Sequence, residues 1–440
     1  MENRKRIMEH FEEQKDFLDG KVEAGIEANR KGCAAITIKD KDNNPVKGAK
    51  IIVNQKTHEF KFGANLFMLD ELETPEKNEL YKRHFADTFN MATLPFYWDA
   101  TEPEKGKTRY AKDSERIYRR PAVDLCMEFC EENGIEPREH ALAYDHFFPE
   151  WLKKKSVSEI KAAYENRCAE IAERYKDKIP TIEVTNEMYW SSECESTFYD
   201  EPDFVEWCFK TAEKYFPANQ LVINEATDWV WKHCARATDP YYAYIEANKL
   251  KGARIDAVGM QYHIFYRAED EYNSTRQLYN PESLYKHMDL YAKLGTLQIT
   301  EVTIPAYSDA PEDEELQAEI LEKLYRIWFS HPAMEQIIYW NLTDGYAYNA
   351  EPGDMSVGEN YFYGGLLRFD MSPKPAYYAI KNLIQKEWHT EAEAETNDSG
   401  KARFKGFYGK YDVEITVNGV KEVREINLSK KGCSDFEFVI

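Results

Sequence analysis

Strand-like and helix-like segments alternate from about residue 60 to residue 390 of this 440-residue chain. Short segments rich in β-branched and aromatic residues predict eight strands, at 60–65, 89–94, 135–142, 181–186, 221–224, 257–262, 297–300 and 336–340. Amphipathic stretches predict helices between them, for example at 157–178, 202–216, 315–329 and 375–386. A strand and a helix that recur about every 39 residues indicate an α/β protein with a parallel (β/α)8 TIM barrel. A nucleotide-binding open sheet is disfavoured, because its first turn is normally glycine-rich and this one reads FGANLFMLDE.

The two ends of the chain carry a different pattern. Residues 1–32 predict an N-terminal helical segment, and residues 33–58 predict a β-hairpin around an Asn-Asn-Pro turn. Residues 391–440 alternate apolar and polar side chains, with Asn418-Gly419 as a hairpin turn. Because an isolated hairpin is marginally stable in water, we expect the two ends to pair into one small β-sandwich beside a barrel at residues 59–390. The sandwich could bind glycan, but a structural cap on the barrel is the favoured interpretation.

The net charge narrows the range of partners. The chain has 57 Lys and Arg residues against 79 Asp and Glu residues, which gives a net charge of −22. Such a chain repels phosphate backbones and anionic lipids, so nucleic acid and membranes are poor partners and a neutral or cationic substrate is favoured. No apolar stretch reaches the roughly 18–20 residues of a membrane span. The first residues lack the apolar core of a secretory signal, which predicts a cytoplasmic protein, or a secreted one if an upstream signal was removed.

Polar side chains fall at the carboxyl ends of the predicted strands, where barrel enzymes place their active sites. From the third strand to the eighth they are His140, Asn186 with Glu187, Asn224 with Glu225, Gln261 with His263, Glu301, and Trp340. The sequence contains no GxSxG elbow, HExxH zinc motif or P-loop, so neither a metal nor a cofactor is expected.

Two of these carboxylates suit the cleavage of a glycosidic bond. One carboxyl group protonates the leaving oxygen, while the other attacks the anomeric carbon or activates water. Glu187 and Glu301 lie three repeats apart, at the ends of the fourth and seventh strands. Across a barrel, two such groups can approach to ~5–5.5 Å, the separation of a retaining mechanism.

An ordered set of motifs identifies a family. The segments are FGANL, FNMATLPFYWDATEPEKGK, HALAYDHFFPEWL, IEVTNEMY, LVINEAT, AVGMQYHIF, LQITEVTI, IIYWNLTDGYAY and LLRFDMSPKPAYYAI. Over about residues 60–390 this set resembles glycoside hydrolase family 10, the endo-β-1,4-xylanase family. The resemblance implies Glu187 as the acid/base, Glu301 as the nucleophile and Asn186 as the amide that touches the sugar 2-hydroxyl. It also implies further positions around the reacting sugar, namely His140, Gln261, His263, Trp340 and Tyr348.

The neighbouring sugar sites depart from the family pattern. Members typically carry Thr-Pro-Glu-Asn-x-Met-Lys-Trp after the second strand, but this chain reads TLPFYW, so Tyr97 replaces the lysine and the asparagine is missing. After the third strand, Tyr144-Asp145 replaces the usual Trp-His. We expect Tyr97 and Tyr144 to contact substrate and Glu225 to be a supporting or rim residue of the binding site. Loss of a polar grip lowers specificity, so short or decorated β-linked oligosaccharides, or aryl or terpenoid glycosides, suit the pocket better than long xylan.

These observations predict a retaining glycoside hydrolase of carbohydrate metabolism or polysaccharide degradation, whose partner is a carbohydrate or glycoside substrate. One alternative is a non-catalytic carbohydrate-binding protein on the same barrel. Another is an exo-acting retaining barrel from a related family. The presence of both Glu187 and Glu301 favours an enzyme over a binding protein.

Overall fold

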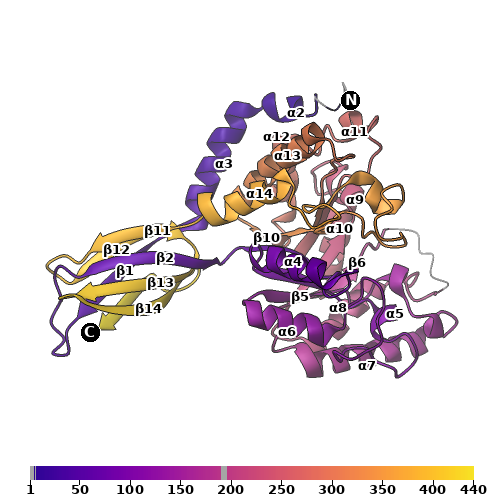
Figure 1. Cartoon of the computed structure of the whole chain (residues 1–440). Helices are drawn as coiled ribbons and strands as arrows, with labels where there is room; N and C mark the ends of the chain where they lie inside the picture. The colour runs from indigo at the N-terminus through magenta and orange to yellow at the C-terminus, as the bar shows by residue number, and fades with distance from the viewer. Residues whose placement is uncertain (1–3, 5, 190–195) are drawn as a thin grey trace.

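The computed structural model describes residue 4, residues 6–189 and residues 196–440. Its centre is a closed barrel of eight parallel strands (Figure 1). The strands follow one another around the barrel in chain order: β3 (Lys61–Asn65), β4 (Met91–Pro95), β5 (Glu136–His140), β6 (Thr181–Asn186), β7 (Gln220–Glu225), β8 (Ala257–His263), β9 (Thr296–Thr303) and β10 (Met334–Tyr339). Pairing of β10 with β3 closes the ring. The predicted barrel and all eight predicted strands are confirmed.

Helices connect successive strands and cover the barrel (Figure 1). Their bounds are α2 (Glu9–Glu12), α3 (Lys15–Arg30), α4 (Pro75–Ala86), α5 (Trp98–Thr101), α6 (Val123–Asn133), α7 (Val157–Tyr175), α8 (Phe204–Tyr215), α9 (Thr227–Trp231), α10 (Pro240–Leu250), α11 (Glu271–Ser274), α12 (Pro281–Tyr291), α13 (Pro311–Ser330) and α14 (Pro375–Asn382). Side-chain caps fix several helix starts. Ser156 and Glu159 bond each other's backbone N–H groups to begin α7, and Thr74 caps α4. Within the described ranges, no helix combines the length and apolar character that crossing a bilayer requires.

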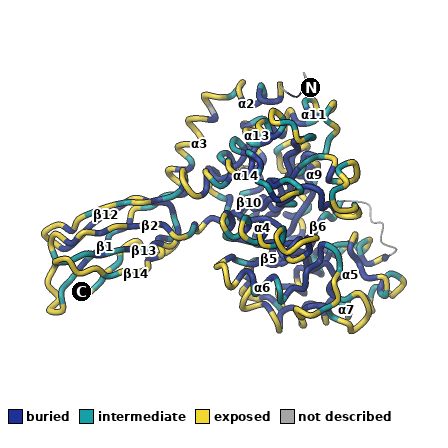
Figure 2. The backbone as a smooth tube through the Cα atoms, viewed as in Figure 1, coloured by how far each residue is buried: buried dark blue, intermediate teal, exposed yellow. Residues whose placement is uncertain are grey.

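The barrel strands are buried, as the dark blue centre of Figure 2 shows. Every residue of β4 and β6 is buried. Helices cover the outside of the barrel and side chains fill its inside, so even the polar strand residues Arg138 and Glu183 are buried. Other buried polar residues lie at the strand ends, for example Asn186 in β6 and Glu225 in β7. Buried polar groups need hydrogen-bond partners, so the C-terminal ends of the barrel strands are a candidate functional site.

Strands from the two chain ends form a two-sheet sandwich beside the barrel (Figure 1). One sheet has the order β12 (Lys401–Phe407), β1 (Lys31–Lys39) and β15 (Asp435–Val439). The other has the order β11 (Glu391–Glu395), β2 (Lys50–His58), β13 (Gly409–Val417) and β14 (Val420–Leu428). The two sheets share an apolar core of their own, which includes Ile36, Val53 and Val413. The predicted pairing of the chain ends is confirmed.

The predicted hairpin at residues 33–58 is wrong. Strand β1 pairs with β12 and β15, whereas β2 pairs with β11 and β13, so the Asn-Asn-Pro turn passes from one sheet to the other. Each strand has one apolar face, and two facing sheets bury both faces, whereas a lone hairpin leaves its face in water. The C-terminal hairpin is confirmed. Strands β13 and β14 pair, and Asn418 and Gly419 have φ of 50° and 83°, as a type I′ turn requires.

The sandwich meets the barrel at the N-terminal ends of the barrel strands. Arg30 at the end of α3 donates hydrogen bonds to the carbonyl oxygens of Phe329, His331 and Met334, and Met334 is the first residue of β10. The ring of Phe329 stacks on Trp388, which leads into β11, with centroids 4.1 Å apart. This junction therefore lies at the end of the barrel opposite the strand ends that were predicted to carry chemistry.

Candidate active site

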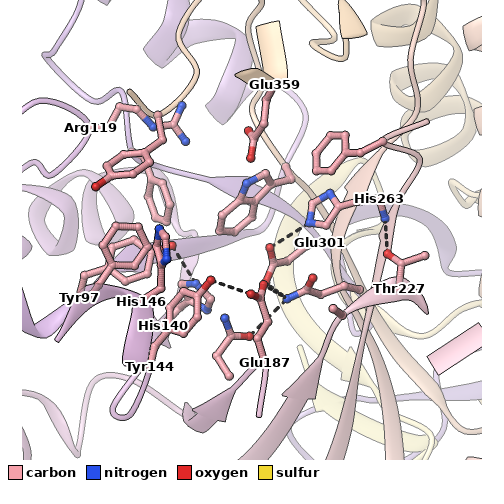
Figure 3. A pocket seen from close by; sticks show the side chains of 18 of the residues that line it. Tyr97, Arg119, His140, Tyr144, His146, Glu187, Thr227, His263, Glu301 and Glu359 are labelled. Atoms are coloured by element: carbon pink, nitrogen blue, oxygen red, sulfur yellow. Dashed lines mark hydrogen bonds and ion pairs between the residues drawn. The ribbon is translucent and has the colours of Figure 1, made fainter. Parts of the chain in front are cut away.

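One pocket opens among the C-terminal ends of the barrel strands and encloses about 370 Å³ (Figure 3). Because parallel strands end at the same rim, residues far apart in sequence meet there. Ten of the residues named from sequence line it: Tyr97, His140, Tyr144, Asn186, Glu187, Gln261, His263, Glu301, Trp340 and Tyr348.

Glu301, on β9, lies at the centre of a hydrogen-bond network and is 4% exposed. Asn224 Nδ2 and Gln261 Nε2 lie 3.1 Å and 3.0 Å from its Oε1, and His263 Nε2 lies 3.1 Å from its Oε2. Thr300 Oγ1 donates to Asn224 Oδ1 at 2.6 Å, which turns the amide nitrogen toward Glu301. Three donors hold the carboxyl group in one orientation and favour its ionised form.

Gln261 joins Glu301 to Glu187 through hydrogen bonds. Its Nε2 lies 2.8 Å from Glu187 Oε1 and 3.0 Å from Glu301 Oε1. Two oxygens that share one nitrogen at these distances lie no more than about 6 Å apart, below the roughly 6.5–9.5 Å of inverting glycosidases. Tyr144 Oη donates to the other oxygen of Glu187 at 2.6 Å. Glu187 has φ of 52°, a left-handed backbone of the kind that clusters at functional sites.

Burial raises the pKa of Glu301 to about 8; the charge of His140 opposes this rise, and that of Glu187 adds to it. The carboxyl pair therefore retains one proton near pH 7. Burial lowers the pKa of His263 to about 4, so its ring is neutral. A neutral ring that donates from Nε2 to Glu301 accepts at Nδ1, where Thr303 Oγ1 lies 3.0 Å away.

A second buried chain of hydrogen bonds orients His140. Its Nδ1 lies 2.8 Å from Glu183 Oε1, and its Nε2 lies 3.0 Å from Tyr97 Oη. The other oxygen of Glu183 pairs with Arg138. Burial on its own raises the pKa of Glu183, but His140 and Arg138 outweigh it and hold this pKa below its usual value. An ionised carboxylate behind the histidine fixes the ring and its tautomer at the pocket wall.

Glu225 lies outside the pocket lining. Its Oε1 accepts the backbone N–H of Ala226 at 2.8 Å, and its Oε2 accepts that of Tyr189 at 3.2 Å. Burial raises its pKa to about 8. Side chains alternate along a strand, and the preceding Asn224 points inward to Glu301, so Glu225 points away from the barrel axis. This position fits the supporting role expected from sequence and not contact with substrate.

Several lining residues were not named as site residues from sequence: Phe67, Arg119, Arg120, His146, Phe147, Thr227, Asp228, Phe265, Tyr266 and Glu359. Phe67, Thr227 and Phe265 follow β3, β7 and β8 within two residues, so nearness to a strand end was an available signal. Arg119 and Arg120 lie in the loop between α5 and α6, far from any strand end, and no periodicity places them.

One group of described residues is close enough to hold a metal ion. A ligand atom from each of His140, Glu183 and Glu301 lies within 4.8 Å of the others. These groups already bond one another or protein donors, because His140 bonds Glu183 and two amides bond Glu301. The cluster is therefore satisfied as a hydrogen-bond network.

Comparison with known proteins gives consistent matches. The model of glycosyl hydrolase family 10 matches residues 54–383. Curated relatives include the anti-sigma-I factor RsgI6 of Acetivibrio thermocellus, 25% identical over 89% of this chain and 45% of the relative. Endo-1,4-β-xylanase 2 of Arabidopsis thaliana is 24% identical over 91% of this chain and 34% of the relative. Endo-1,4-β-xylanase B of Thermotoga neapolitana is 26% identical over 74% of this chain and 88% of the relative. The chain thus spans less than half the length of the first two relatives.

Solved structures match the barrel. Native xylanase 10B from Thermotoga maritima is 25% identical with a TM-score of 0.60, and the match covers 75% of this chain and 96% of that one. Xylanase 10B from Thermotoga petrophila, in complex with xylobiose, is 22% identical with a TM-score of 0.58, over 75% of this chain and 95% of that one, and shares the fold. The family match covers most of the chain and spans every barrel strand from β3 to β10. The chain belongs to glycosyl hydrolase family 10.

Proposed function

We propose that this protein cleaves β-glycosidic bonds by a retaining double displacement, with Glu301 as the nucleophile and Glu187 as the acid/base. The observation that carries the proposal is the hydrogen bonding of Gln261 Nε2 to both carboxyl groups, at 2.8 Å and 3.0 Å. Carboxyl groups that share one donor are too close to admit the water that an inverting mechanism places between them and the sugar. Family membership supports the same two roles.

In the first step, an oxygen of Glu301 attacks the anomeric carbon and forms a glycosyl ester. The bond from that carbon to the leaving oxygen breaks, and the proton of Glu187 moves to the leaving oxygen. In the second step, the ionised Glu187 takes a proton from water, whose oxygen attacks the same carbon. The ester bond breaks, which restores the Glu301 carboxylate and the protonated Glu187 with the anomeric configuration retained.

The hydrogen bonds support this order of roles. Glu301 receives N–H donors from Asn224 and Gln261 and contacts the neutral ring of His263, which suits an ionised nucleophile. Glu187 has fewer donors, so we assign it the proton that the pair retains near pH 7. Once Glu301 becomes an ester, its negative charge disappears and Glu187 ionises more readily, as the second step requires.

The proposed substrates are short or decorated β-1,4-linked xylo-oligosaccharides and related glycosides. One solved relative is a complex with xylobiose, and another is a complex with xylotriose. Trp340, Tyr348 and Phe147 line the pocket, and aromatic rings pack well against the C–H surfaces of sugars. The sandwich contacts the opposite end of the barrel, which supports a structural cap at residues 33–58 and 391–440.

A panel of nitrophenyl β-glycosides tests the proposal: xyloside, xylobioside, glucoside and arabinoside. We expect turnover of at least one xylo-substrate and a loss of about 10⁴-fold or more in kcat for Glu301→Ala. Azide should restore turnover to Glu187→Ala, because the small anion replaces the water that Glu187 activates. Glu225→Gln is the matched control. Its carboxyl group is neutral near pH 7 and contacts only backbone N–H groups, so kcat should stay within about tenfold.

Two outcomes would contradict the proposal. Glycan binding with no turnover of any substrate would indicate a non-catalytic carbohydrate-binding barrel. Near-normal turnover by Glu301→Ala together with an inactive Glu225→Gln would show that the catalytic carboxylates are misassigned.

A further inference from the structure

Arg119 and Arg120 form a cationic wall of the pocket, and only 3% and 5% of their surfaces are exposed. Neither guanidinium pairs with an Asp or Glu among residues 4, 6–189 and 196–440. By contrast, the nearby Arg116 pairs with Glu71. Burying a cation without a counter-ion is unfavourable for folding, which suggests that these two arginines are kept for binding.

The guanidinium of Arg120 is covered on its faces and open along its edge. Its central carbon lies 4.1 Å from the centre of the Tyr97 ring, 4.8 Å from that of Phe147 and 5.5 Å from that of Tyr348. Rings over a guanidinium plane leave the N–H donors, which point outward in that plane, for hydrogen bonds. In the part of the chain that the structure describes, only Nη1 has a protein acceptor, the carbonyl oxygen of Arg119 at 2.9 Å.

Arg119 also keeps an unused donor. Its Nη2 donates to Asn341 Oδ1 at 2.8 Å and its Nη1 to the carbonyl oxygen of Tyr346, but its buried Nε has no partner in the described structure. Asn341 in turn donates to Glu359, so an amide stands between this cation and that carboxylate. Figure 3 shows Arg119 and Glu359 at one end of the pocket, away from Glu187.

The other charges near Arg120 do not neutralise it. Asp99 attracts it without forming an ion pair, and burial raises the pKa of Asp99, which weakens the negative charge it offers. Arg119 repels it. The chain as a whole is strongly anionic, but net charge describes the distant field, whereas this stretch of the pocket wall is locally cationic.

We infer that Arg120, with Arg119 beside it, binds a carboxylate of the substrate, so that the pocket selects β-glycosides that contain a uronic acid. The inference rests on the proposed function, because it specifies the substrate class of the same site. A carboxylate presents two oxygens in one plane, which match the Nε and Nη2 donors along the free edge of Arg120. The uronate is either a side branch on the oligosaccharide or the reacting sugar itself.

Pairs of substrates that differ only by the carboxylate test the inference. One pair is xylotetraose with a single glucuronate branch and the same oligosaccharide with that carboxyl group reduced to the alcohol, and the other is nitrophenyl β-glucuronide and nitrophenyl β-glucoside. We expect the wild-type kcat/KM to favour the acidic member of one pair by about tenfold or more. The first pair reports a branch site, and the second reports the reacting sugar.

Substitutions assign the preference to Arg120. Arg120→Met should bring the acidic-to-neutral ratio of kcat/KM close to one, and Arg120→Lys should keep part of it, because a lysine retains the charge without the planar fork. Arg174→Met is the matched control. Arg174 is an exposed arginine 5.0 Å from the centre of the Tyr110 ring and outside the pocket lining, so the ratio should not change.

Failure of this inference and failure of the proposed function can be told apart. Cleavage of both members of each pair at equal kcat/KM would overturn the inference and leave the proposed function standing. If no member is cleaved, the proposed function fails, and calorimetric titration decides the carboxylate site. Tighter binding of the glucuronate-branched oligosaccharide than of its carboxyl-reduced counterpart would support the site, and equal binding would overturn it. The wild-type ratio is decisive even where an Arg120 variant does not fold.

Discussion

Two buried arginines lie at opposite ends of the barrel, one at the junction with the sandwich (the structural end) and one in the pocket (the proposed binding end). Their hydrogen bonding differs. Arg30 and Arg120 are 8% and 5% exposed, and each lies over an aromatic ring, Phe60 at 4.6 Å and Tyr97 at 4.1 Å. Arg30 donates hydrogen bonds to three carbonyl oxygens, whereas Arg120 donates to one. A buried cation with most of its N–H donors paired to backbone carbonyl oxygens fits a structural position. One with most of its donors unused costs stability and fits a position that a ligand completes.

The largest effect is expected at the binding end. Glu301→Gln should lower kcat by about 10⁴-fold or more because it removes the proposed nucleophile. The same change should not lower Tm at pH 8, because it replaces a buried group whose ionisation burial opposes. Steady-state kinetics and thermal melting on one preparation measure both quantities. A fall in Tm that accompanied the loss of activity would place Glu301 with the structural residues.

Arg30→Met is the counterpart at the sandwich end. It leaves the carbonyl oxygens of Phe329, His331 and Met334 without this donor, which should lower the free energy of unfolding by about 3 kcal/mol. The kcat of the folded enzyme should not change, because the site is at the other end of the barrel. Denaturant unfolding and kinetics below Tm check the two halves. An unchanged Tm with a reduced kcat would contradict a purely structural role for Arg30.

Tyr144→Phe should have a smaller effect, confined to the positioning of Glu187. The hydroxyl of Tyr144 donates to Glu187 Oε2 at 2.6 Å, so the substitution removes a donor that holds this carboxyl group in place. We expect kcat/KM to fall by about tenfold, measured by steady-state kinetics. Tyr348→Phe, in the same pocket, keeps its ring and should leave kcat/KM nearly unchanged. An unchanged kcat/KM in Tyr144→Phe would mean that this hydrogen bond does not position the proposed acid/base.

The pH dependence of stability should also originate at the binding end. Burial raises the pKa of Glu225 and of Glu301 to about 8, well above their ordinary value. From about pH 7 to pH 8.5 the folded protein still binds a proton on Glu225 and one on the Glu187–Glu301 pair, whereas the unfolded chain does not, so the free energy of unfolding should fall as pH rises. Buried His58, whose pKa burial lowers to about 4, acts in the opposite direction, but its effect is complete near pH 7.

Thermal melting across this pH window should show a decline of a few degrees. Glu225→Gln should flatten the decline, whereas Glu79→Gln, at an exposed position, should not change it. A Tm that rises with pH in the wild type would contradict the protonation that we assign to Glu225 and to the Glu187–Glu301 pair.

The periodicity of the sequence predicts the barrel strands and the residues at their ends. The repeat of strand and helix predicts β3 to β10, and the rule that sites form at strand ends predicts that Glu187, Gln261 and Glu301 meet. The hairpin prediction failed because alternation in β1 and β2 shows that each strand has one apolar face, but not which partner covers it. Local pattern specifies the face of a strand, while the pairing depends on chain segments hundreds of residues away.

The sequence does not predict that Arg119 and Arg120 line the pocket, for a related reason. Arg119 and Arg120 lie in an irregular loop, and only the tertiary structure brings Arg120 over Tyr97 and Arg119 over Phe67. Glu225 shows the limit of the strand-end rule, because alternation points it away from the axis although it ends β7. Side-chain direction at a strand end decides whether a residue meets the substrate, and it follows from the register of the strand.

The most direct test of the account is covalent trapping of the glycosyl enzyme. A 2-deoxy-2-fluoro-β-xylobioside with a good leaving group forms the intermediate and hydrolyses it slowly, so the ester accumulates. Mass spectrometry of the intact protein should then show one added fluoroglycosyl unit, and peptide mapping should place it on Glu301. Turnover of the parent glycoside without any covalent label, or a label on a different residue, would contradict the central claim.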